Sequence, residues 1–328
     1  MEQLSLKHLS SPLVLRHLTI SRFIGGPLDG ITDSPFRRLM RRYCTQSLLY
    51  SEMRHVSSVA HDKTGERTLR FLPLERPLNY QIAANTVRDI EPAIAKIIAA
   101  GVDAIDLNCG CPAKNVIRSG SGSALMADLP RMREIVTLLR RLIPGIFTVK
   151  IRAGFKEKNA VVVAQLLQDL GVDAIALHPR TQTQQFAGQP DYAIAAAVRQ
   201  AVTIPVFFSG GVVNYQTAAI VYQKTGIDAF LIGRGIWARP WKLLEMQAHA
   251  AGEPYAITHS AVLAAALEHF DLMLAYYGEH GLYNFRKHLP FYLRGLAGAA
   301  QLRAALVTAE DERYIRQALQ HAYEQSKE

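Results

Sequence analysis

Short apolar runs alternate with amphipathic stretches from Arg22 to Gly252. The apolar runs have the length of β-strands and are bounded by Gly, Pro and polar turns. Eight of them occur, at residues 22–26, 46–52, 78–82, 101–105, 146–154, 171–178, 204–211 and 226–235. The segments between them mostly show the apolar spacing of helices. This alternation of strand and helix predicts an α/β fold, a parallel (β/α)8 barrel of the TIM type.

The pattern changes after a short linker, Gly252-Glu-Pro254. Three later stretches show helical periodicity without any strand pattern, at residues 262–277, 285–296 and 310–323. A chain of 328 residues with 49% hydrophobic content is long enough for a large core and a smaller second one. We therefore expect a barrel domain at residues 1–252 and a small C-terminal all-helical bundle domain at residues 256–328.

Shortly after the fourth apolar run, two cysteines are expected on a loop, in Asn108-Cys109-Gly110-Cys111-Pro112. Pro112 blocks helix continuation and stiffens the position beside Cys111. A thiol on such a loop, at the carboxyl end of a barrel strand, is placed to meet a ligand. The alternative is that both cysteines simply pack, since free cysteine is often buried. The spacing alone does not choose between the two thiols.

Other strand ends also carry polar residues or glycines. Gln81 ends the third run, and such a glutamine often makes only a structural hydrogen bond. Lys150 lies within the fifth run, where a buried charge is costly without a partner. His178 ends the sixth run, and a single histidine there is more often structural than catalytic. The seventh and eighth runs end in Ser209-Gly210-Gly211 and Gly233-Arg234. Loops in these two places commonly bind phosphate in barrels of this type.

The net charge of +9 favours a polyanionic partner. The segment from Ala256 onward has 7 basic and 8 acidic residues, so the first 255 residues carry the excess, +10. The helix expected after Asp33 contains Arg37, Arg38, Arg41 and Arg42. We interpret them as a solvated outer face, with an RNA contact as the alternative.

Three cysteines are too few for a disulfide framework, and none has the spacing of a zinc site. No apolar run is long enough for a membrane span. Residues 1–21 lack the apolar core of a signal peptide. We expect a cytoplasmic, monomeric protein without a metal ion.

The stretch Asn108-Cys-Gly-Cys-Pro-Ala-Lys-Asn-Val116 resembles the active-site signature of the tRNA-dihydrouridine synthases, closest to their bacterial DusB-like subgroup. These flavin enzymes reduce uridine in RNA. Further resemblance lies in Pro27-Leu28-Asp29, in Val149–Gly154 and in His178–Thr181, and it extends from about Ser21 to about Tyr323. Departures are Leu28 in place of the usual Met and Ser209 in place of the usual Asn.

The resemblance implies bound FMN, NADPH as electron donor and tRNA as the nucleic-acid partner. By position in the motif, Cys111 is then the catalytic acid. The cofactor-binding residues it implies are Pro27, Leu28, Asp29, Gln81, Asn108, Lys150, His178, Ser209, Gly210, Gly211, Gly233 and Arg234. Residues 284–293 resemble the Arg-Lys-His segment of the family, and here a solvated helix face and an RNA contact stay equal alternatives.

Two other functions fit the same residues. The first is an FMN-dependent barrel that reduces a free small molecule such as a pyrimidine, which the charge excess and the helical segment disfavour. The second is an RNA chaperone with a vestigial flavin site, which the matching Cys111, Lys150 and His178 disfavour. The expected function is therefore flavin-dependent reduction of uridine to 5,6-dihydrouridine in RNA, most simply tRNA.

Overall fold

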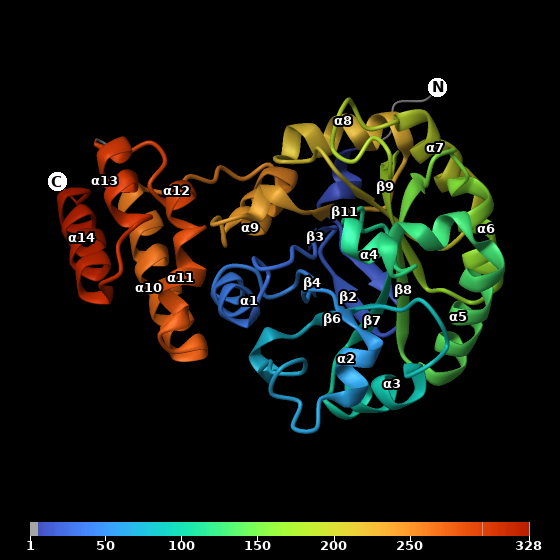
Figure 1. Ribbon diagram of the computed structural model, residues 1–328. Helices are drawn as coiled ribbons and strands as arrows, with labels where there is room; N and C mark the ends of the chain where they lie inside the picture. The colour runs from blue at the N-terminus through green and yellow to red at the C-terminus, as the bar shows by residue number, and fades with distance from the viewer. Residues whose placement is uncertain (1–5, 297, 328) are drawn as a thin grey trace.

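The computed structural model describes residues 6–296 and 298–327. It contains a closed barrel followed by a helical region, as the apolar pattern predicts (Figure 1). Residues 1–5, at the start of the expected barrel domain, lie outside the described part, as do Ala297 and Glu328 of the expected helical domain. None of the helices in the described part combines the length and the apolar character that a bilayer crossing requires.

Eight parallel strands close the barrel, since β4 pairs with both β3 and β6. Most of the residues of these strands are buried. The strands are β3 (Phe23–Gly25), β4 (Leu49–Tyr50), β6 (Leu78–Ala83), β7 (Ala104–Cys109), β8 (Ile146–Gly154), β9 (Ala174–Thr181), β10 (Val206–Ser209) and β11 (Ala229–Ile232). A two-residue strand, β5 (Arg54–His55), adds to the edge of β6.

Helices cover the outside of the barrel (Figure 1). They are α1 (Ser34–Arg41), α2 (Val56–His61), α3 (Ile90–Ala99), α5 (Leu129–Leu142), α6 (Ala160–Asp169), α7 (Tyr192–Ala201), α8 (Tyr215–Thr225) and α9 (Lys242–Ala251). Local sequence sets their ends: the Asp33 carboxylate accepts from Phe36 N at 3.1 Å and starts α1. Gly226, with a φ of 65°, ends α8.

An antiparallel hairpin precedes the barrel and was not expected from the sequence. It consists of β1 (Leu13–Leu15) and β2 (Leu18–Ile20). Leu13, Leu15 and Ile20 pack into one apolar cluster with the first residues of several barrel strands, Ala104, Ile146, Ala174 and Ala229 among them. The hairpin therefore closes the amino-terminal end of the barrel.

The C-terminal helices form a second apolar cluster. They are α10 (His259–Tyr277), α11 (His280–Arg286), α12 (Leu289–Tyr292), α13 (Ala299–Leu306) and α14 (Glu312–Gln325). Phe270, Phe285 and Leu319 lie in its core, together with Trp241 from the segment before α9. The helix expected at residues 285–296 is in fact broken: α11 ends at Arg286, and the new helix α12 begins at Leu289 with Pro290 in its first turn. The helix α13 was not expected.

The interpretation of the arginines on α1 was wrong for two of the four. Arg37 is buried and forms an ion pair with Glu75 at 2.6 Å. Arg41 is also buried and donates to backbone carbonyls, including that of Ser47 at 2.7 Å. Arg38 is half-buried and only Arg42 is exposed. The buried pair therefore anchors α1 to the segment before β6 and offers no free outer face.

The Arg-Lys-His segment is likewise not a plain solvated face. His288 is fully buried. Its ring lies 5.7 Å from that of Phe36 on α1. Lys287 reaches toward the barrel, where its Nζ would lie 3.1 Å from a Cβ on Gly30. Together with the hydrogen bond from Tyr277 OH to Asp33 Oδ2 (3.0 Å), these contacts join the helical region to α1 and to the turn after β3.

Candidate active site

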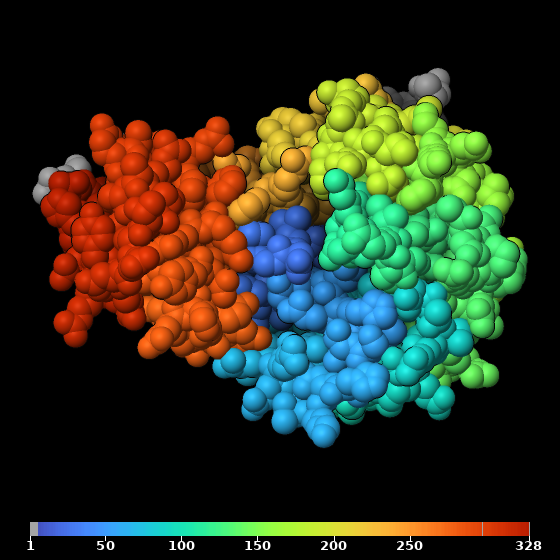
Figure 2. Space-filling model, in the orientation of Figure 1, coloured from blue at the N-terminus to red at the C-terminus, as the bar shows by residue number. Residues whose placement is uncertain are grey.

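The carboxyl ends of the barrel strands bring the expected polar residues onto one face. Gln81 on β6 is the register partner of Asp106 on β7, and Asn108 on β7 is the partner of Lys150 on β8. His178 on β9 follows at the next strand. Figure 2 shows a hollow between the orange helices of the C-terminal region and the green segments of the barrel, with blue N-terminal segments at its floor.

Two side-chain amides at this face have a defined orientation. Asn108 Oδ1 accepts from the backbone N–H groups of Gly110 (3.0 Å) and Cys111 (2.8 Å). The nitrogen of Asn108 must therefore point the other way, where it donates to Gln81 Oε1 at 2.9 Å. Gln81 Nε2 in turn donates to the buried carboxylate of Asp106 at 2.8 Å. Each amide nitrogen carries two protons, so one N–H of each residue stays available to a ligand.

The carboxylate of Asp106 is the buried end of this chain of hydrogen bonds. Its second oxygen accepts from Thr148 Oγ1 at 2.6 Å, and Thr148 also accepts from Asn79 Nδ2 at 2.9 Å. Burial raises the pKa of Asp106 to about 7, while its hydrogen bonds from Thr148 and Gln81 act in the opposite direction. The hydrogen bond to Asp106 therefore fixes the orientation of the Gln81 amide, and the hydrogen bond to Gln81 fixes that of Asn108.

The two neighbouring cysteines have different environments. Cys109 is fully buried at the end of β7, and burial raises the pKa of its thiol well above the ordinary range. Cys111 is partly exposed. Its carbonyl accepts from Ser123 Oγ (2.8 Å), and the preceding carbonyl, of Gly110, accepts from Arg152 Nε (2.7 Å). Of the two thiols, Cys111 is therefore the one that a ligand can reach.

His178 is held as a neutral ring. Its Nε2 lies 3.1 Å from Arg180 Nη1, and a guanidinium can only donate. His178 Nε2 is therefore the acceptor, which leaves the proton of the neutral ring on Nδ1. Burial, and then the positive charges of Lys150 and Arg152, lower the pKa of His178 to about 2. Near neutral pH the ring adds no charge to the site and can donate one hydrogen bond.

Lys150 is a cation without a fixed partner. Burial, followed by the charge of Arg152, lowers its pKa to about 8, while Asp106 acts to raise it. No hydrogen bond or ion pair joins its ammonium group to the described residues, and the side chain is half-buried. The site therefore has a partly desolvated positive charge that an anionic ligand can compensate.

The glycine turns border His178 and leave little space for larger residues. Gly210 has a φ of 107°, and a Cβ there would lie 2.6 Å from His178 Nε2, so only glycine fits. Gly233 faces Leu28, whose Cδ2 would lie 3.8 Å from a Cβ on Gly233. The remaining expected residues lie in these same turns or directly after β3; they are Pro27, Asp29, Ser209, Gly211 and Arg234. All of the expected residues therefore lie at one end of the barrel.

Comparison with known proteins identifies the family. A family model for "Dihydrouridine synthase (Dus)" matches residues 24–328. The chain is 36% identical to "tRNA-dihydrouridine synthase B" of Pseudomonas aeruginosa over 298 residues, which cover 89% of each chain. It is 34% identical to "Probable tRNA-dihydrouridine synthase 1" of Synechocystis sp. over 302 residues, 90% of this chain and 85% of the relative.

This chain belongs to the dihydrouridine synthase family. The fold has a separate match among solved structures. Morphinone reductase aligns with a TM-score of 0.58 at 13% identity, over 76% of this chain and 91% of that one. At such low identity the match supports the barrel fold only, and it agrees with the closed eight-stranded sheet described above.

Three residues of the candidate site were not assigned a role from the sequence. They are Asp106, Arg152 and Arg180, and all three are buried. Arg152 joins the loop of Cys111 to the loop after β9, since its Nη1 donates to the carbonyls of Thr181 (3.0 Å) and Gln185 (2.8 Å). The available signal was a charged residue within an apolar strand, which is costly unless it is paired.

Proposed function

We propose that this protein reduces uridine to 5,6-dihydrouridine in tRNA, with bound FMN as the cofactor and NADPH as the reductant. The names of the relatives support tRNA as substrate. The observation that carries the proposal is the position of Cys111, a partly exposed thiol on a loop fixed through Asn108, close to a cation without a partner, Lys150.

The residues at the barrel mouth fit a flavin. Gln81 Nε2 and Asn108 Nδ2 each keep one free N–H, and Lys150 adds a positive charge. These are the donors that the acceptor-rich edge of a flavin ring needs. Gly210 lets the His178 ring pack against the turn after β10, which a Cβ would prevent. The turns after β10 and β11, including Ser209, Gly211, Gly233 and Arg234, would hold the phosphate, which is the usual place in this barrel.

Bound FMN supplies the hydride that reduces the C5–C6 double bond of uridine. Cys111 then donates a proton to C5 of the base, and solvent returns a proton to the sulfur. An ordinary thiol is protonated at neutral pH, as a proton donor must be. Lys150 stabilises negative charge in the site, and neutral His178 orients the cofactor through its Nδ1 proton. General acid catalysis of this kind contributes about 10²–10⁴-fold.

The uridine must leave the folded RNA to reach this thiol. Extruding a base costs a few kcal/mol, which phosphate contacts elsewhere offset. We propose that residues 256–328 are an RNA-binding domain and that the RNA docks between it and the barrel. The +10 charge of the first 255 residues supports RNA contact by the barrel, and residues 256–328 would contribute shape and orientation.

The decisive experiment measures dihydrouridine in bulk tRNA from a deletion strain and its parent. We expect the strain to lose the nucleoside at one or more positions and to regain it with the wild-type gene but not with a Cys111→Ala gene. Unaltered dihydrouridine in the deletion strain, together with purified protein that binds no FMN on reconstitution, would refute the proposal. Turnover of free uridine or uracil but not tRNA would favour a small-molecule reductase.

A further inference from the structure

A pocket lined by arginines lies beside the candidate active site, between the barrel and α10. It is a shallow depression, open to solvent, with a cavity volume of about 30 Å³. The strand end after β4, α1, the loop before β6 and α10 all contribute to its walls. The side chains that matter for its charge are Arg37, Glu52, Arg54, Arg67, Arg70 and Tyr276.

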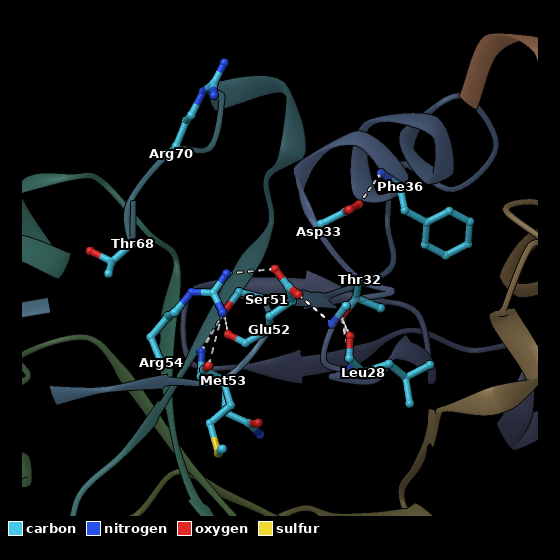
Figure 3. A network of polar contacts seen from close by, with 12 residues as sticks. Leu28, Thr32, Asp33, Phe36, Ser51, Glu52, Met53, Arg54, Thr68 and Arg70 are labelled. Atoms are coloured by element: carbon cyan, nitrogen blue, oxygen red, sulfur yellow. Dashed lines mark hydrogen bonds and ion pairs between the residues drawn. The ribbon is translucent and has the colours of Figure 1, made fainter. Parts of the chain in front are cut away.

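Two of the four arginines are already compensated. Arg37 pairs with the buried Glu75 at 2.6 Å. Arg54 pairs with Glu52 at 2.9 Å, and Figure 3 shows the two side chains facing each other below the loop that carries Arg70. Each pair is neutral, so neither adds net charge to the pocket.

The other two arginines leave the pocket with uncompensated positive charge. The side chain of Arg67 is exposed and has no hydrogen bond or ion pair with the described residues. Arg70 lies with its guanidinium carbon 4.1 Å above the ring of Tyr276 and donates to the Tyr276 carbonyl at 2.8 Å. Tyr276 OH donates back to the Arg70 carbonyl at 2.9 Å. Arg70 is thus held in place without losing its charge to a carboxylate.

Direct contacts connect the pocket to the candidate active site. Glu52 Oε1 accepts from the backbone N–H of Gly30 at 2.7 Å, in the turn that also contains Leu28 and Asp29. On the other wall, Tyr276 precedes Tyr277, which donates to Asp33. The pocket therefore lies where the barrel, the helical region and the mouth of the active site meet.

We propose that this pocket binds a phosphate of the RNA substrate, near the uridine that enters the active site. This inference rests on the proposed function. The fixed guanidinium of Arg70 and the unpaired one of Arg67, both in the lining of the pocket, suit a phosphate, because a guanidinium presents several donors in one plane. The pocket also spans the barrel and the helical region, between which the RNA is proposed to dock. A phosphate bound there fixes the path of the backbone beside the extruded base.

The test compares Arg67→Gln with a matched variant outside the pocket, Arg133→Gln. Arg133 is exposed on α5, and its side chain, like that of Arg67, has no hydrogen bond or ion pair with the described residues. Both changes remove one positive charge. Binding of unmodified tRNA is measured at a series of salt concentrations without NADPH. We expect the slope of log affinity against log salt to fall by roughly 1 in Arg67→Gln, and to stay at the wild-type value in Arg133→Gln.

A second variant and a second ligand sharpen the result. Arg67→Lys keeps a charge and should restore most of the slope. Equal slopes in the wild type, Arg67→Gln and Arg133→Gln would overturn the inference. So would an unaltered tRNA affinity in Arg67→Gln with slower bleaching of the flavin by NADPH, because the phosphate would then belong to the reductant. Since binding is measured without turnover, a failure of the proposed reaction alone would not change these outcomes.

Discussion

Cys109 and Cys111 are separated by one glycine, yet only one of them can meet a substrate. Cys109 is fully buried and Cys111 is partly exposed. We expect Cys111→Ala to keep its FMN and to lose about 10²–10⁴-fold in the rate of uridine reduction, the usual contribution of a general acid. Single-turnover reoxidation of the reduced enzyme by unmodified tRNA measures this rate.

Cys109→Ala is the matched control for the loop. It removes a buried sulfur atom, so we expect a loss in the free energy of unfolding of about 1 kcal/mol and a rate near that of the wild type. If Cys109→Ala were the slow variant and Cys111→Ala the active one, Cys111 would not be the acid.

Asp106, inside the barrel, fixes the orientation of the side-chain amides of Gln81 and Asn108. Asp106→Asn preserves shape but offers one acceptor and one donor where Gln81 Nε2 and the Thr148 hydroxyl both need acceptors. One buried hydrogen bond is then lost, at a cost of about 1–3 kcal/mol. We expect weaker FMN binding and faster alkylation of Cys111 by iodoacetamide in the FMN-free protein.

The control for Asp106→Asn is a carboxylate with several partners at the other end of the barrel. Asp173 accepts from the backbone N–H of Phe147 and pairs with Arg16 and Arg140. Asp173→Asn should also lower the stability, without a change in FMN affinity or in alkylation of Cys111. If Asp106→Asn lowered stability only, its role would be structural and not one of positioning.

The loop after α4 (Lys114–Arg118) contains Gly120 and Gly122 and packs against the Cys111 loop. Gly122 has a φ of 62°, and a Cβ there would lie 2.7 Å from Val116 Cγ1 and 3.0 Å from the Cys111 carbonyl oxygen. Gly122→Ala should therefore cost about 1–2 kcal/mol for the backbone alone and, in addition, displace Cys111. We expect uridine reduction to be slower, whereas the rate at which NADPH bleaches the flavin should not change.

Gly120→Ala separates backbone strain from displacement of the thiol. Gly120 also has a positive φ, 83°, but a Cβ there would meet only the end of the flexible Arg131 side chain within 3.4 Å. Its variant should lose similar stability in urea unfolding and keep most of its activity. Equal loss of activity in both variants would mean that general loosening of the loop, not contact with Cys111, is responsible.

The elements that the sequence predicted correctly are those with a clear period or a clear boundary. All eight barrel strands were predicted, and the closed sheet confirms them, although β7 runs to Cys109 and so contains Asn108 and Cys109, which were expected on the loop after residues 101–105. The strand-end residues Gln81, Lys150 and His178 could be placed on one face because parallel strands in a barrel all end on the same side. The hairpin at Leu13–Ile20 was missed since strands of three residues show no period.

The sequence predictions were wrong or incomplete where a side chain pairs with a residue that lies far away in the sequence. Arg37 has a solvent-facing pattern on α1, but Glu75 pairs with it 38 residues later. Asp106 and Arg152 were not assigned roles for the same reason, because their partners lie on other strands and loops and are set by register. Local patterns place a strand end correctly and do not say which side chains it will meet.

At the scale of the whole molecule, the barrel and the helical region share a buried aromatic contact. His269 and His288 of the helical region lie with ring centroids 4.5 Å apart, and Phe36 of the barrel lies against both. Neither ring nitrogen of His288 has a partner among the described residues. Burial, and then the proximity of His269 and Lys287, lower the pKa of His288 well below its ordinary value. The contact is therefore built for a neutral ring and should weaken in acid.

The sign of the pH dependence follows from the two states. The unfolded chain takes up a proton at this histidine near pH 6.5, while the folded protein does so only at much lower pH. The stabilising contribution of neutral His288 is thus complete above pH 6.5 and is lost as the pH falls below it, by about 1.4 kcal/mol per pH unit. Asp33 and Asp106, whose pKa burial raises to about 7, act in the opposite direction, so the wild type alone does not isolate the effect.

The difference between the wild type and His288→Leu isolates the pH-dependent contribution of His288 to the free energy of unfolding. Leucine keeps an apolar side chain at the contact and cannot titrate. Between pH 7.5 and pH 5.5 we expect the free energy of unfolding of His288→Leu to rise relative to the wild type by about 1.4 kcal/mol, measured by urea unfolding at each pH. His17→Leu, at an exposed position, is the control for removing one histidine. A parallel pH course in wild type and His288→Leu would show that His288 is protonated as readily in the folded protein as in the unfolded chain, and that the contact is not sealed from solvent.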